Sequence, residues 1–120
     1  EFAGYREKED LMRLVADSKL VVLPSRWYEN LPFSIMESFA LGKPVIASDI
    51  GGIPEMVEDE INGLLFPPED EGGLMEQLKR LLSGGELRAE MGAAARKKAQ
   101  RRYSSSSHYQ RIMEIYQGLL

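Results

Sequence analysis

The chain has 120 residues, of which 43% are hydrophobic and 28% charged, a balance typical of a globular domain that excludes a disordered segment. The absence of cysteine excludes disulfide frameworks and thiolate metal sites, and with a single histidine we expect no metal site. The formal net charge of −4 argues against a nucleic-acid partner, and no apolar run reaches the length of a membrane-spanning helix.

Length and chain start bear on the domain organisation. A chain of this size forms one domain or less, and it opens on Glu1 rather than on an initiator methionine. We therefore expect residues 1–120 to be a single partial domain of a longer protein. A chain without cysteine is compatible with the cytoplasm, where we expect the protein to reside.

Helices and short apolar strands alternate over the first part of the chain. The predicted elements are, in order, a helix over 7–17, a strand over 20–23, a helix over 34–41, a strand over 44–47, a helix over 53–57 and a strand over 64–66. Each strand is apolar throughout, as in parallel sheets buried on both faces. The sequence therefore predicts an α/β, Rossmann-like fold of three layers, in which helices flank a parallel sheet of three to four strands.

The chain after Phe66 is predicted to be helical. A first helix ends near Leu82, a second runs from Glu86 to about Arg102, and a third follows. The apolar stripe of the third helix consists of Tyr109, Ile112, Met113, Tyr116 and Leu120. Ser83 and Glu86 have the spacing of a capping box, and we expect the serine patch 104–107 to supply the N-cap of the last helix.

Positive charge gathers near the end of the second of these helices. The residues are Arg96, Lys97, Lys98, Arg101 and Arg102. We interpret them as cations that complement the macrodipole at a solvated helix C-terminus. Contact of the longer protein with an anionic membrane surface is the alternative.

The loop from Pro24 to Phe33 is the first candidate for a ligand site. It has ten residues, whereas strand-to-helix loops usually have about two to six. Right-handed crossovers place every such loop at the carboxyl edge of a parallel sheet, where ligands of open α/β sheets bind. With Trp27, Tyr28 and Glu29 in it, the loop favours binding over mere connection.

The helix that follows this loop begins with the amides of Ser34, Ile35 and Met36, which lack partners within a helix. Such a helix start attracts phosphate, and Pro32 stiffens the approach to it. We expect a nucleotide diphosphate to lie across this helix start.

Several of these residues have a structural alternative. Ser34 and Glu37 match a capping box, in which the Glu37 carboxylate returns to the Ser34 amide, so that residue is either a cap or a ligand contact. Glu29 is either a ligand contact or a solvated loop acid. The pair Gly51-Gly52 is either a plain tight turn or a second turn that approaches phosphate.

Five stretches of the chain form a specific combination. They are Pro24-Ser25; Glu29 with seven residues before Glu37; Ala40-Leu41-Gly42-Lys43-Pro44-Val45-Ile46-Ala47; Gly51-Gly52-Ile53-Pro54-Glu55; and Asn62-Gly63-Leu64-Leu65. Together with Phe2-Ala3-Gly4 and the apolar run 20–23, they resemble the donor-site signature of the family 4 (group 1) glycosyltransferases, enzymes of the GT-B fold. The resemblance spans nearly the whole chain.

The resemblance implies a retaining transfer of a sugar from a nucleotide-sugar donor such as a UDP-, GDP- or ADP-sugar, without a required metal ion. It implies that Glu29 is the catalytic residue, beside the donor sugar and phosphates. It implies also that Glu37 binds the ribose hydroxyls. The further positions assigned to donor binding are Asn30, Leu31, Pro32, Ser34 and Ile35. Family members usually have a small residue near Leu31, so Leu31-Pro32 is expected to narrow the sugar pocket.

The resemblance also implies that parts of the enzyme are missing. The family's glycine-rich turn and diphosphate-binding basic pair are absent, as is the acceptor-binding domain, and Arg26 is no obvious replacement. We therefore expect this chain alone to be inactive. The alternative function is a non-catalytic α/β fragment that self-associates and keeps the motif by ancestry.

Truncation has a structural consequence for the sheet. In the doubly wound order, the three predicted strands correspond to strands 4, 5 and 6, with Phe2-Ala3 a remnant of strand 3. The strand over 20–23 then has an unpaired edge, and such edges pair with other chains. We expect a homodimer joined at or near Leu20–Leu23.

Overall fold

The computed structural model describes residues 1–119, and the apolar position predicted at Leu120 lies outside the described residues. The strands are β1 (Val21–Leu23), β2 (Val45–Ser48) and β3 (Gly63–Phe66). The helices are α1 (Lys8–Asp17), α2 (Phe33–Ala40), α3 (Ile53–Met56), α4 (Glu71–Ser83), α5 (Gly85–Arg102) and α6 (Ser105–Leu119). The predicted alternation of helices and strands is confirmed, with small shifts of the element ends.

Within residues 1–119, the strands form one parallel sheet in the order β1-β2-β3. Val21 pairs with Val45, and Val45 pairs with Gly63, so the three strands start in register. The prediction that Phe2-Ala3 forms a remnant of a fourth strand is wrong, because residues 1–4 lie outside the sheet and Phe2 is fully exposed. Two such residues bury too little surface to hold a strand at a sheet edge.

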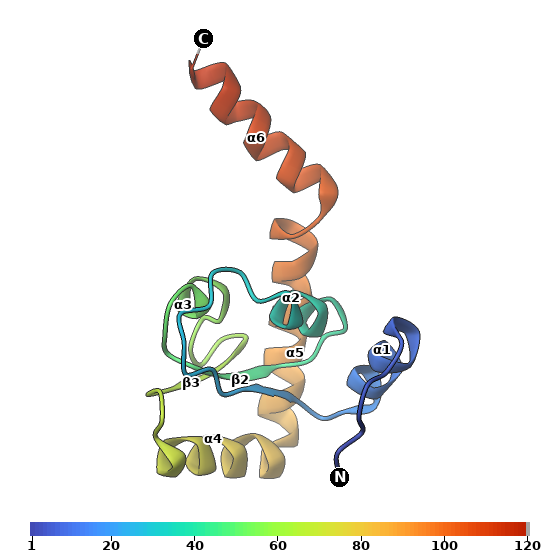
Figure 1. Cartoon of the computed structure of the whole chain (residues 1–120), viewed down its shortest axis with the longest axis vertical. Coiled ribbons are helices and arrows are strands. Elements are labelled where there is room, and N and C mark those ends of the chain that lie inside the picture. The colour runs from blue at the N-terminus through green and yellow to red at the C-terminus, as the bar shows by residue number, and fades with distance from the viewer. Residues whose placement is uncertain (120) are drawn as a thin grey trace.

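Helices cover both faces of the sheet (Figure 1). Successive side chains of a strand point to opposite faces, so Val45 and Ala47 pack with α2, α3 and α5, whereas Ile46 packs with α4 and α5. Helix α5 runs alongside both layers, placing Ala95 in one core cluster and Met91 in the other. The predicted three-layer α/β fold is confirmed.

Of the two serine caps predicted in the helical part, one is wrong. Helix α4 continues through Ser83, whose hydroxyl donates to the Lys79 carbonyl at 2.7 Å, and Gly84 is the N-cap of α5. The capping box fails because Ser83 still lies inside the preceding helix. At the start of α6, the Ser107 amide donates to the Ser104 hydroxyl at 3.2 Å, so that predicted cap is confirmed.

The basic residues of α5 do more than complement the end of their own helix. Arg96 donates to the Ala40 carbonyl at the end of α2 (2.7 Å), and Lys98 donates to the Met56 carbonyl at the end of α3 (2.7 Å). Each cation thus meets the negative end of a neighbouring helix. Lys98 also donates to Glu58 at 2.7 Å, and this hydrogen bond lowers the pKa of the Glu58 carboxyl.

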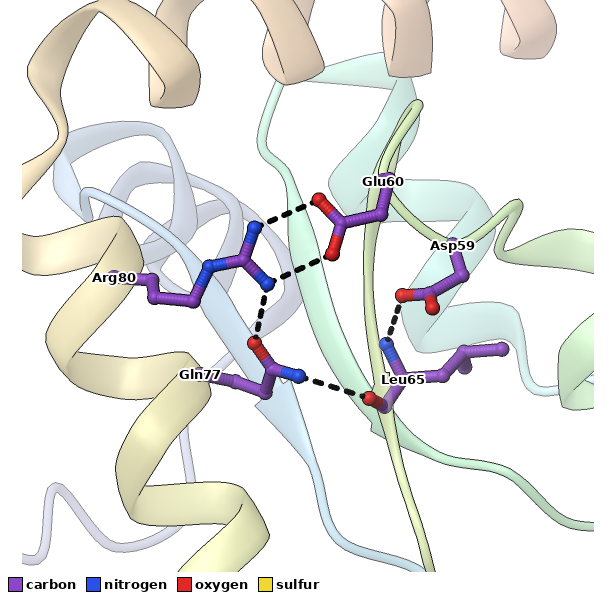
Figure 2. A network of polar contacts seen from close by, with 5 residues as sticks. All are labelled: Asp59, Glu60, Leu65, Gln77 and Arg80. Carbon is purple, nitrogen blue, oxygen red and sulfur yellow. Dashed lines mark hydrogen bonds and ion pairs between the residues drawn. The ribbon is translucent and has the colours of Figure 1, made fainter.

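Side chains cover the outer edge of β3 (Figure 2). The Leu65 amide donates to Asp59 (2.8 Å), and the Leu65 carbonyl accepts from Gln77 of α4 (3.3 Å). Arg80 donates to both carboxylate oxygens of Glu60 at 2.7 Å, and these hydrogen bonds lower the Glu60 pKa. The edge strand therefore has its outward backbone groups satisfied within the chain, which blocks pairing with another strand there.

Helix α6 extends away from the sheet (Figure 1). Its stripe residues Tyr109, Ile112 and Tyr116 are exposed, and no described residue of the helix is buried. The predicted stripe is present, but of its members within residues 1–119 Met113 alone is even half-buried.

Candidate functional site

Two connections lie at the carboxyl edge of the sheet. One is the segment 24–32, called here the Glu29 loop, which joins β1 to α2; the other is the segment 49–52, which joins β2 to α3. Both follow parallel strands that end side by side, because Leu23 pairs with Ala47. The predicted position of the site at this edge therefore agrees with the topology.

Glu29 is held by two side chains of its own loop. Its Oε1 atom accepts a hydrogen bond from the Ser25 hydroxyl at 3.2 Å and one from the Trp27 indole nitrogen at 3.0 Å. Ser25 is buried, whereas Trp27 is largely exposed. The interpretation of Glu29 as a merely solvated loop acid is therefore wrong, while its role toward a ligand stays a prediction.

Glu37 lies on the second turn of α2 and is half-buried. The helix begins at Phe33 with Pro32 as N-cap, and no side chain makes a capping hydrogen bond. The capping-box interpretation of Ser34 and Glu37 is therefore wrong, because Ser34 already lies inside the helix. Within residues 1–119 no hydrogen bond or ion pair engages the Glu37 carboxylate, which leaves it available to a ligand.

The start of α2 differs in one respect from the prediction. The Ile35 amide donates to the Pro32 carbonyl at 3.1 Å, so it already has a partner. Pro32 is buried, whereas Asn30 and Leu31 are exposed at the site. An anion at this helix start would therefore find fewer unsatisfied amides than the three predicted.

The turn at Gly51-Gly52 lies against the Glu29 loop. The Gly52 amide donates to the Glu29 carbonyl at 2.7 Å, and Gly51 adopts a left-handed φ of 60°. The Gly52 amide is therefore already used, and whether this pair also approaches phosphate stays a prediction. Its contact with Glu29 was not predicted, since spacing in a sequence gives no sign of which backbone a turn meets.

A small cavity of about 110 Å³ adjoins the Glu29 loop. Its lining includes Pro24 and Arg26 from the loop, Phe66 at the end of β3, and Asp70 from the connection between β3 and α4. Arg26 lies 3.7 Å from the carboxylate of Glu69, both side chains being exposed. The nearest cation in sequence to Glu29 is thus directed to another carboxylate.

Ser48 is an additional polar group of this edge. It ends β2, is buried, and its hydroxyl has no hydrogen-bond partner within the described residues. The residues 1–119 bring no three His, Asp or Glu side chains together to hold a metal ion; whether the transfer requires one stays a prediction.

Comparison with known proteins identifies relatives over almost the whole chain. A family model described as glycosyl transferases, group 1, matches residues 1–98. The amylovoran biosynthesis glycosyltransferase AmsK of Erwinia amylovora is 30% identical, over 99% of this chain and 30% of its own length. The alpha-D-kanosaminyltransferase of Streptomyces kanamyceticus is 32% identical, over 97% of this chain and 30% of its own.

Solved structures agree with the family match. Alr3699/HepE of Anabaena in complex with UDP superposes with a TM-score of 0.89 and 29% identity, over 98% of this chain and 32% of that one. The same protein was solved with UDP-glucose. Sucrose-phosphate synthase of Thermosynechococcus elongatus gives a TM-score of 0.88 and 29% identity, over 99% of this chain and 30% of that one. This chain therefore spans about a third of the length of these proteins.

Proposed function

The chain belongs to the group 1 glycosyltransferases, and from this premise we propose that it forms the nucleotide-sugar-binding part of a retaining enzyme. Its longer protein transfers a sugar from the donor to an acceptor. The observation that carries the proposal is the pair of carboxylates at the carboxyl edge, of which Glu37 has no protein partner within the described residues. UDP is the nucleotide to test first, because a neighbour of 29% identity binds UDP and UDP-glucose.

The two carboxylates suit different parts of such a donor. An ionised carboxylate is a strong acceptor for hydroxyl donors, so Glu37 accepts from the ribose hydroxyls. Glu29 lies beside the donor sugar, where its Oε2 atom accepts from a sugar hydroxyl. The exposed residues Asn30 and Leu31 line the sugar position, and the start of α2 at Ser34 faces the diphosphate.

The isolated chain binds the donor weakly and does not catalyse transfer. It spans 30% of the length of its relatives, so the acceptor site and further diphosphate contacts lie outside it. We propose a cytoplasmic location for the protein, because its nucleotide-sugar donor would be available there. None of the helices in residues 1–119 is long and apolar enough to cross a membrane.

Titration of the ¹⁵N-labelled chain with UDP tests this function. We expect shifts of the Ser34, Met36 and Glu37 amides at millimolar UDP, and smaller shifts with GDP or ADP if uridine is the preferred base. Amides of α6, which is remote from the carboxyl edge (Figure 1), serve as the internal control. Unmoved amides at millimolar concentrations of all three nucleotides would favour the alternative, a fragment that keeps the motif without binding.

We propose in addition that two copies pair through β1. The Val21 amide donates to the carbonyl of Pro44, the residue before β2 (3.1 Å), so the neighbouring Val22 amide points to the outer side of the sheet. Within residues 1–119 no hydrogen bond covers that side, in contrast to the covered edge of β3.

Sedimentation of the chain at micromolar concentration tests this pairing. We expect a dimer for the wild-type chain and a monomer for Val22→Pro, since an edge strand tolerates proline but can no longer donate a hydrogen bond from that position. A wild-type monomer contradicts this proposal.

A further inference from the structure

The Glu29 carboxylate is oriented by contacts to one of its two oxygens. Both the Ser25 hydroxyl (3.2 Å) and the Trp27 indole N–H (3.0 Å) donate to Oε1, while Oε2 has no hydrogen bond within the described residues. Ser25 is 5% exposed and therefore fixed in position, whereas Trp27 has 66% of its surface exposed. Two donors on one oxygen fix the direction in which the other points.

The backbone that carries Glu29 rests directly on the Gly51-Gly52 turn. A Cβ atom at Gly52 would lie 2.2 Å from the Asn30 carbonyl oxygen, and one at Gly51 would lie 2.7 Å from the Glu29 carbonyl oxygen. Both distances are below the 3.0 Å that real Cβ contacts keep. The obstacle in each case is backbone, which cannot rotate away as a side chain can, so any side chain on this turn must displace the loop.

We infer that Ser25 and Trp27 are positioning residues for Glu29. We infer also that the Gly51-Gly52 turn supports their loop at the edge of the sheet. The functional meaning of the inference rests on the proposed donor site, in which a carboxylate oxygen must meet a sugar hydroxyl at a fixed place. Ordering the carboxylate before the ligand arrives lowers the entropic cost of binding. The glycine pair thus acts through Glu29.

The indole of Trp27 provides the readout, because it is the single tryptophan of the chain. Its Nε1–H gives one cross-peak in a ¹H–¹⁵N spectrum, and the Glu29→Ala chain gives the position of this peak without its carboxylate acceptor. We expect Gly52→Ala to move the peak upfield toward that position. Ser25→Ala, which adds no volume, is expected to move it part of the way, because the carboxylate loses its second anchor.

Gly72→Ala is the matched control. A Cβ atom at Gly72 would come no closer than 3.5 Å to its nearest neighbour, Asp70, which is ordinary contact, so the indole peak should stay in place. An indole peak that Glu29→Ala or Gly52→Ala leaves unmoved overturns the inference. If Gly52→Ala does not fold, as thermal melting would reveal, Ser25→Ala decides, and an unmoved peak in that chain overturns it. No nucleotide is present in these spectra, so the outcome is separate from that of the UDP titration.

Discussion

Phe39→Ala is expected to lower the free energy of unfolding by about 3–5 kcal/mol, the usual cost of truncating a buried phenylalanine. Phe39 is fully buried in α2 and packs in the cluster that joins this helix to Val45 and Ala47 of β2. The cost combines the lost burial of the ring with the cavity that a rigid sheet cannot close. Urea denaturation followed by far-UV circular dichroism measures the change.

Phe33→Ala is the matched control on the same helix. Phe33 is 69% exposed, so its loss is expected to change the free energy of unfolding by less than about 0.5 kcal/mol. Because both substitutions remove the same ring from one helix, intrinsic helix propensity cancels between them. A loss at Phe33 as large as that at Phe39 would mean that the helix does not pack on the sheet through the face described.

The strands could be predicted because their sequence signal is local and strong. Val45, Ile46 and Ala47 are apolar in succession and follow Pro44, a pattern typical of a strand covered on both faces. The structure buries all of them between two helical layers. Their order followed from the doubly wound order that the family resemblance implies, in which these three strands are neighbours.

The helix ends were harder to predict because an N-cap depends on which residue is the first to adopt helical backbone angles. The spacing of Ser34 and Glu37 fits a capping box, yet α2 begins one residue earlier and Pro32 takes the N-cap. The fixed φ of a proline and the contacts of the loop before it decide that boundary. The four-residue pattern of a capping box includes neither the preceding proline nor the contacts of the loop.

Long-range polar contacts were not predictable at all. Lys98 meets the end of α3 across 42 positions of the sequence, and Arg96 meets the end of α2 across 56. Basic residues in a row look like a solvated surface until the packing of the helices is known. The same holds for the Glu29 loop, where the residues that orient the carboxylate lie nearby in sequence but the turn that supports it does not.

Glu37→Gln is expected to weaken UDP binding by about 10- to 100-fold, the value of one or two hydrogen bonds to a charged acceptor. The substitution keeps the size of the side chain but removes its charge and one of its two acceptor oxygens. Since no hydrogen bond within residues 1–119 uses this carboxylate, the free energy of unfolding should stay within about 0.5 kcal/mol of the wild-type value. Glu86→Gln, in the first turn of α5 and outside the site, is the control and should leave UDP binding unchanged.

Replacing UDP by 2′-deoxy-UDP makes the test specific to the ribose. If Glu37 accepts from the 2′-hydroxyl, the wild-type chain binds the deoxy nucleotide more weakly than UDP, whereas the Glu37→Gln chain discriminates less between them. Such a cycle isolates the coupling between one side chain and one hydroxyl from any general loss of charge at the site. Equal losses for both nucleotides in the variant would place Glu37 away from the 2′-hydroxyl and leave its charge, rather than a hydrogen bond, as the source of the effect.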